Sequence, residues 1–190
     1  MAQEIEIEFK NLLTIDEYNK LLKHIPFPTE SQIQTNYYFE TKHRSLQELG
    51  CALRIREKNN FYQLTLKEPH EKGLLETHDT LSKEEADNWI QGKVIEKPET
   101  IARLKDLGIH LSSLHCFGSL TTKRKELYKN NIIFVLDYSF YNGNSDYELE
   151  LEADTRENGF TQFQELLHRY QIPRRKTPNK VERFFASFEN

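Results

Sequence analysis

The stretch EIEIEFK, residues 4–10, decides how this chain of 190 residues is interpreted. Acidic or basic side chains occupy its even positions, and large apolar side chains occupy its odd positions. Successive side chains of a β-strand point to opposite faces, so the stretch predicts a strand with one charged face and one apolar face. The fold depends on which of these two faces points into the protein.

Seven later segments also carry strand signals, and several follow one another through short asparagine-containing turns that favour hairpins. These predicted strands are residues 35–40, 51–57, 61–68, 73–80, 117–128, 132–139 and 146–153. Helical periodicity predicts five helices between and after them. These helices are residues 15–25, 83–92, 99–107, 160–171 and 179–188. We expect Thr14 and Ser82 to be N-caps, with Glu85 completing a capping box after Ser82. Hairpins dominate, so we expect an antiparallel sheet within an α+β fold.

Composition narrows the class of protein. The net charge is −4 and the isoelectric point is near 6.0, which gives no reason to expect nucleic acid as the partner. Neither an apolar run of membrane-spanning length nor a signal peptide is visible, so we expect a cytoplasmic protein without a membrane partner. Cys51 and Cys116 lie far apart in the sequence and are expected to be reduced thiols.

Charges are sorted by strand rather than mixed. Residues 148, 150 and 152 are all glutamate, as are residues 4, 6 and 8, whereas Arg54 and Arg56 share the face of another strand. In one arrangement, apolar faces fill a sandwich core and the charges are solvated. In the inverted arrangement, helices cover the apolar faces and the charged faces line a cavity. The residues alone leave both arrangements open.

The inverted arrangement implies a ligand. Alternating arginines suit bidentate recognition of phosphate oxygens, and clustered carboxylates suit Mg²⁺ or Mn²⁺. Opposed acidic and basic walls are costly unless a ligand and a metal bridge them. A compact polyanion carrying a divalent metal, such as a triphosphate, fits these requirements.

An ordered set of motifs resembles the CYTH domain family, also called triphosphate tunnel metalloenzymes, and especially its small Gram-positive bacterial members. The set begins with the E-x-E-x-K motif at residues 6–10 and ends with the late E-x-E pair at residues 148–150. Between them lie Arg54 and Arg56, Lys67, Glu76 and Arg124. The resemblance implies one CYTH domain over residues 1–190, folded as a closed eight-stranded antiparallel barrel with a charged interior and outer helices.

The resemblance also implies roles for individual residues. Metal-binding and catalytic roles would fall to Glu6, Glu8, Glu76, Glu148 and Glu150. Phosphate contacts would fall to Lys10, Arg54, Arg56, Lys67, Arg124 and Lys180. Glu4 and Glu152 share the parity of the motif glutamates but lie outside the motifs, and Asp137 is a further acid on the same side. Lys180 resembles a position that closes over one tunnel mouth, although an exposed helix lysine is the alternative.

The implied activity is metal-dependent hydrolysis of inorganic triphosphate, thiamine triphosphate or a nucleoside triphosphate. One alternative is a class IV-type adenylyl cyclase, but residues 1–5 lack the His-Phe pair that precedes the motif in those enzymes. The other alternative is a non-catalytic binder of polyphosphate or nucleotide. Thr122 departs from the lysine that some triphosphatases carry, and Lys123 points the other way by parity. His78 shares parity with Glu76, but we expect it to have a surface or packing role.

Overall fold

The computed structural model describes residues 3–188, which form nine β-strands, six α-helices and one 3₁₀ helix. The strands are β1 (Gln3–Glu6), β2 (Glu8–Leu13), β3 (Gln32–Thr41), β4 (Ala52–Lys58), β5 (Phe61–His70), β6 (Gly73–Leu81), β7 (Leu114–Lys129), β8 (Ile132–Tyr141) and β9 (Asn144–Ala153). The helices are α1 (Ile15–His24), α2 (Ser45–Glu48), α3 (Lys83–Ile90), α4 (Pro98–Asp106), α5 (Arg156–Arg169) and α6 (Lys180–Ala186), with the 3₁₀ helix at Leu111–Ser113.

The chain divides into two compact units, each built from separate segments of sequence. Unit 1 comprises Met1–Ile5 and Gln34–Leu120, and unit 2 comprises Glu6–Ile33 and Thr121–Asn190. No helix among residues 3–188 is both long enough and apolar enough to span a membrane.

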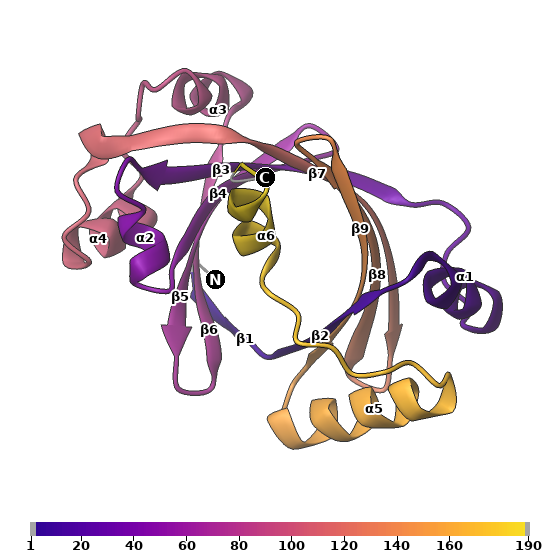
Figure 1. The fold of residues 1–190 in the computed structure, drawn as a ribbon. Helices are drawn as coiled ribbons and strands as arrows, with labels where there is room; N and C mark the ends of the chain where they lie inside the picture. Colours follow the sequence, from indigo (N-terminus) through magenta and orange to yellow (C-terminus); the bar gives the residue numbers. More distant parts are fainter. Residues whose placement is uncertain (1–2, 189–190) are drawn as a thin grey trace. The chain divides into compact units, whose positions relative to one another are not determined.

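Unit 1 contains strands in the order β1-β6-β5-β4-β3, with antiparallel pairing across β3, β4, β5 and β6. Asn59 and Asn60 form the β4–β5 turn with φ of 53° and 61°, as a tight hairpin of this twist requires. The apolar face of the sheet packs against α2, α3 and α4 (Figure 1). Leu64 of β5, Trp89 of α3 and Leu104 of α4 are almost completely buried in this cluster.

Unit 2 contains strands in the order β7-β8-β9-β2, and all its pairings are antiparallel. Its apolar face packs against α1 and α5, whereas α6 lies on the opposite side (Figure 1). The ring centroid of Phe9 in β2 lies 5.9 Å from that of Phe163 in α5, and the two rings are tilted by 33°. A Cβ on Gly159 would lie 2.6 Å from the Phe9 ring, so only glycine allows α5 to approach so closely.

The α+β class and the antiparallel sheet are confirmed. Within each unit the structure has the helix cover of the inverted arrangement. In both units the helix-covered face is the apolar one. The helix cover is incomplete at one end of the stretch 4–10, because Ile5, one of its apolar odd positions, is 44% exposed. The helix α6 places Lys180 and Arg183 over charged residues of β9, unlike the helices that cover the apolar face.

The structure has nine strands instead of the predicted eight because the stretch 4–10 splits at Ile7. The part before Ile7 pairs with β6, and the part after it pairs with β9, so the chain changes partner at this residue. The N-caps at Thr14 and Ser82 and the capping box of Ser82 with Glu85 are confirmed, and Thr14 also forms a capping box with Glu17. Helix α5 begins four residues earlier than predicted.

The short helix α2 was missed because four residues are too few to show a helical period. It is held instead by the buried carboxylate of Glu40, which accepts hydrogen bonds from the backbone N–H groups of Leu46 and Gln47.

Candidate functional site

The charged face of unit 2 is assembled by strand register. Residues directly opposite each other on one face of an antiparallel sheet lie side by side. The opposed pairs are Glu8 with Glu152, Lys10 with Glu150, Asp137 with Glu148, and Arg124 with Asp137. Strands β2, β7, β8 and β9 therefore bring most of the predicted unit 2 residues to one surface.

The ammonium group of Lys180 lies among three carboxylates of this face. Its Nζ is 2.9 Å from Asp137 Oδ2 and 3.0 Å from Glu148 Oε2. It is also 2.5 Å from Glu150 Oε1. Asp137 and Glu148 are completely buried, and Glu150 is 6% exposed. Lys180 is therefore a buried ion-pair partner, and the alternative of an exposed helix lysine is excluded.

Arg124 contacts the same carboxylates from the β7 side. Its Nε donates to Asp137 Oδ1 at 2.9 Å, and its NH2 donates to Asp137 Oδ2 at 2.7 Å. The same NH2 donates to Glu150 Oε2 at 2.6 Å. Its NH1 lies farther from carboxylates, 3.8 Å from Glu126 and 3.9 Å from Glu152. Most donors of Arg124 thus already bind carboxylate oxygens.

Arg183 of α6 is a third cation at this face, and the sequence analysis missed it. Its NH2 donates to Glu148 Oε2, and its Nε donates to Asp146 Oδ2 at 2.9 Å. Arg183 follows Lys180 by three residues, so the two side chains project from the same face of α6. This three-residue spacing from Lys180 is the signal in the sequence that could have identified Arg183.

Burial and the neighbouring charges act against each other on the pKa values of Glu148, Glu150 and Lys180. Burial opposes ionisation of Glu150, but the charges of Lys180 and Arg124 outweigh it and hold its pKa well below the ordinary value. For Glu148, burial prevails and raises the pKa, although Lys180 and Arg183 oppose the rise. The pKa of Lys180 is raised well above its ordinary value, because Glu148 and Glu150 outweigh the effect of burial.

The donor set of unit 2 fits a hard divalent cation. Glu148 Oε1 is buried and has no hydrogen-bond partner among the residues that the structure describes. A buried carboxylate oxygen in this state is costly unless a ligand occupies it. Carboxylate oxygens are also the protein ligands that Mg²⁺ and Mn²⁺ prefer. The side chains present can therefore hold such an ion.

The E-x-E-x-K motif contributes to the edge of the same face. Lys10 Nζ lies 2.5 Å from Glu8 Oε1 and also contacts Asn179 Oδ1, a residue that the sequence analysis did not select. Glu6 ends β1 and Glu8 begins β2. The motif thus spans the break between two strands, and only its last three residues belong to β2.

Unit 1 carries the remaining predicted residues on its own polar face. Lys67 lies opposite Glu76 and forms an ion pair with it, and Arg54 lies opposite Thr65. Arg56 Nε donates to Asn36 Oδ1 at 3.1 Å. Arg54 Nε is buried without a hydrogen-bond partner in the part of the chain that the structure describes. This unpaired donor is suited to an anionic ligand.

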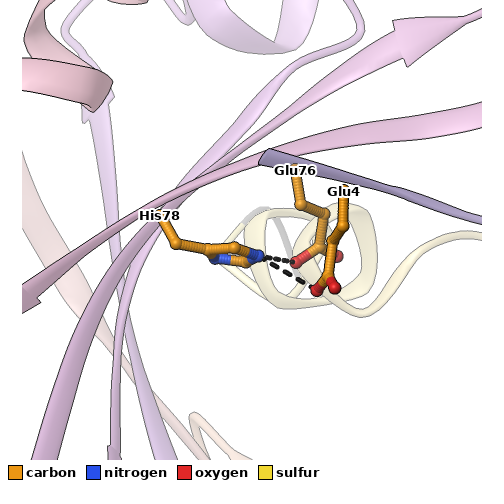
Figure 2. Close-up of side chains that lie close together, drawn as sticks. All are labelled: Glu4, Glu76 and His78. Atoms are coloured by element: carbon orange, nitrogen blue, oxygen red, sulfur yellow. Dashed lines mark hydrogen bonds and ion pairs between the residues drawn. The ribbon is translucent and has the colours of Figure 1, made fainter. Parts of the chain in front are cut away.

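Glu4, Glu76 and His78 form a separate cluster at the β1–β6 edge of unit 1. Figure 2 shows the His78 ring directed at the two carboxylates, which lie side by side. His78 Nε2 is 3.1 Å from Glu4 Oε1 and 3.5 Å from Glu76 Oε2. We expected a surface or packing role for His78, and its contacts with two glutamates were not part of that expectation.

Comparisons with known proteins agree with this arrangement of charged strands. The model of the CYTH domain matches residues 4–185. The chain belongs to the CYTH domain family. It is 42% identical over 187 residues to a Bacillus subtilis protein named "Putative triphosphatase YjbK", covering 97% of this chain and 96% of that protein.

Two solved structures have a fold similar to that of this chain. A crystal structure from Bacillus halodurans, titled a "putative adenylate cyclase", is 40% identical and has a TM-score of 0.94, covering 97% of this chain and all of that one. A Hippeastrum protein, HpAC1, is 21% identical with a TM-score of 0.80 and covers 96% of each chain. Its title reports a dominant triphosphatase activity for that protein, and the likeness to this chain concerns the fold alone.

Proposed function

We propose that this CYTH protein hydrolyses a triphosphate with the help of a divalent metal ion, Mg²⁺ or Mn²⁺. The observation that carries the proposal is the buried group of Asp137, Glu148 and Glu150 on one sheet face, with an unpaired oxygen on Glu148. The relationship to the Bacillus subtilis protein supports a triphosphate as the substrate class. Inorganic triphosphate, thiamine triphosphate and nucleoside triphosphates are the candidates.

In this proposal the metal ligands are acidic side chains. They are Glu6, Glu8, Glu148 and Glu150, with Glu76, Glu4, Asp137 and Glu152 as secondary candidates. A divalent ion held by such carboxylates supplies neutralisation of phosphate charge and activation of water. Neither requires a covalent intermediate with the protein, which is consistent with phosphoryl transfer as a reaction of positioning and electrostatics.

The basic side chains bind and orient the substrate. We assign phosphate contacts to Lys10, Arg54, Arg56, Lys67, Arg124 and Lys180. Arg54 has an unpaired Nε, so it can donate to a phosphate oxygen without losing a protein contact. Lys180 and Arg124 would instead exchange carboxylate partners for phosphate oxygens, and the acidic group they release would then be neutralised by the divalent ion. Arg183 would keep its ion pair with Glu148.

The proposal includes the wider setting predicted above. The protein would act as one CYTH domain in the cytoplasm, on a small-molecule substrate, without nucleic acid or membrane as partner. The acidic isoelectric point near 6.0 supports the absence of nucleic acid from that list.

The test is product analysis with each candidate triphosphate in the presence and absence of Mg²⁺ or Mn²⁺. We expect metal-dependent release of phosphate, and we expect Glu148→Gln to lower kcat at least about 100-fold, the scale of losing one strong electrostatic contact in a catalytic site. Glu165→Gln, an exposed glutamate of α5, is the matched control and should leave kcat unchanged.

Three results would overturn the proposal. Cyclic AMP with pyrophosphate from ATP would identify a cyclase, and tight triphosphate binding without any product would identify a binding protein. If the Glu148→Gln variant kept the wild-type rate, the acidic group of unit 2 would not be part of the active site.

A further inference from the structure

We propose that Glu4, Glu76 and His78 form a second metal site, lying wholly within unit 1 and selective for borderline transition ions such as Zn²⁺. One ligand atom of each residue lies within 4.8 Å of the others. The cluster combines one imidazole nitrogen with two carboxylates, a mixed set unlike the all-carboxylate group of unit 2 (Figure 2).

The distances suit coordination of one ion. Two ligands held at about 2.1 Å from Zn²⁺ at tetrahedral or octahedral angles are about 3.0–3.4 Å apart. His78 Nε2 is 3.1 Å from Glu4 Oε1 and 3.5 Å from Glu76 Oε2, and all three ligand atoms lie within 4.8 Å of one another. An ion can bind the three atoms once the exposed Glu4 side chain adjusts to close the remaining spacing. Three protein ligands leave at least one position open for water or another ligand.

Groups outside the cluster orient the ligands toward this point. Thr65 Oγ1 lies 3.0 Å from His78 Nδ1, and Thr65 is buried at 1% exposure. With Nδ1–H donating to this hydroxyl, Nε2 presents its lone pair to the two glutamates. Metal-binding histidines usually use the other ring nitrogen in this way, and the contact fixes the tautomer. Lys67 contacts Glu76 Oε1, which leaves Oε2 directed toward His78.

The chemistry of the donors sets the class of ion. Imidazole nitrogen favours Zn²⁺ and its first-row neighbours, whereas Mg²⁺ prefers oxygen donors in near-ideal octahedral geometry. The Glu4 side chain is 65% exposed, so an ion can reach the site from solvent. We therefore expect Zn²⁺ to bind here and Mg²⁺ not to compete with it at equal concentration.

The test measures Zn²⁺ binding by calorimetry on the full chain without substrate. A Glu148→Gln/Glu150→Gln background removes two carboxylates of unit 2, and we expect it to retain one equivalent of bound Zn²⁺. In that background, Glu4→Gln and His78→Gln should each weaken Zn²⁺ binding at least about 10-fold. His168→Gln, an exposed histidine of α5, is the control and should change nothing.

Two further readouts separate coordination from folding. The ¹⁵N resonance of His78 Nε2 should shift on addition of Zn²⁺ and not on addition of Mg²⁺. Thr65→Val should weaken Zn²⁺ binding about 10–100-fold, and Thr65→Ser, which keeps the hydroxyl, should restore it. Because Glu4 is exposed, its substitution tests the site even where the other variants disturb the strand.

The inference does not rest on the proposed function, since binding is measured without turnover. Equal Zn²⁺ affinity in the wild type and the Glu4→Gln and His78→Gln variants would overturn it, as would full competition by Mg²⁺. Loss of triphosphatase activity in the Glu148 variants would test the proposed function alone, because the Zn²⁺ site of unit 1 contains no residue of unit 2.

Discussion

Unit 1 and unit 2 both place helices on the apolar face of an antiparallel sheet, yet their opposite faces differ in how charge is balanced. In unit 2, Asp137, Glu148 and Glu150 are buried and are neutralised by Lys180 and Arg183 from α6 and by Arg124 from β7. In unit 1, Arg54 Nε has no hydrogen-bond partner among residues 3–188, and Lys67 pairs with Glu76 within the sheet.

The difference shows two ways to keep charges on a sheet face. Unit 2 holds its carboxylates close together by internal ion pairs, which a divalent ion can later replace. Unit 1 leaves a buried arginine donor without a hydrogen-bond partner in the described residues, which favours an anion. The following substitutions test this contrast, from the largest expected effect to the smallest.

Arg124→Ala is expected to have the largest effect on stability. It removes the bidentate partner of Asp137, which is completely buried, and breaking a buried ion pair on one side costs about 3–5 kcal/mol of unfolding free energy. Urea denaturation measures this loss. Lys123→Ala, on the opposite face of the same strand, is the control and should cost much less.

Lys180→Met should cost less than Arg124→Ala and should respond to metal. It retains most of the side-chain volume but leaves Asp137, Glu148 and Glu150 without their shared ammonium. The melting temperature should fall, and millimolar Mg²⁺ or Mn²⁺ should recover more of it than the same ion adds to the wild type. A melting temperature insensitive to metal would contradict the view that the ammonium occupies a cation position. Lys176→Met, an exposed lysine, is the matched control.

The smallest effect is expected at the pair Glu17–Arg175, which ties α1 to the segment after α5. Arg175 donates two hydrogen bonds to Glu17, at 2.8 and 2.9 Å. Burial of Glu17 opposes ionisation, but the hydrogen bonds from Arg175 and Thr14 outweigh it and lower its pKa below 4.5. Glu17→Gln should therefore cost about 1–2 kcal/mol at pH 7.

That cost depends on pH in a defined direction. A carboxyl group with a lowered pKa in the folded state adds stability above its unfolded pKa, and this stability is lost as pH falls through the folded value. The difference in unfolding free energy between the wild type and Glu17→Gln should shrink below about pH 4. A difference that stays constant from pH 7 to pH 3 would contradict an ionic contribution.

Much of the fold followed from the sequence because its signals are local. Strand alternation, asparagine turns and capping boxes each depend on a few neighbouring residues, and the elements they predict are present. The split at Ile7 was not visible because it depends on a change of partner strand, which alternation does not encode. Helix α2 depends on the side chain of Glu40 and has no periodic signature of its own.

The site was predictable in its residue types more than in its contacts. Parity placed Glu148 and Glu150 on one face of their strand, and the register of β8 with β9 puts Asp137 opposite Glu148. Arg183 was not predicted, because only Lys180 was considered and not the residue three positions later on the same face of that helix. His78 was recognised as sharing parity with Glu76, but the exposed Glu4 that completes the cluster lies 74 residues from His78 in the sequence, on another strand.

The order of strands in unit 2 has a consequence for how the protein is made. β2 leaves the ribosome well before its partner β9, which ends at residue 153, and α6 follows still later. The hairpins β7–β8 and β8–β9 can close locally, whereas β2 must wait for a partner that is synthesised much later. Addition of β2 to β9 is therefore expected to follow closure of these hairpins, and the alternating stretch 4–10 should become resistant to proteases only after β9 has been synthesised.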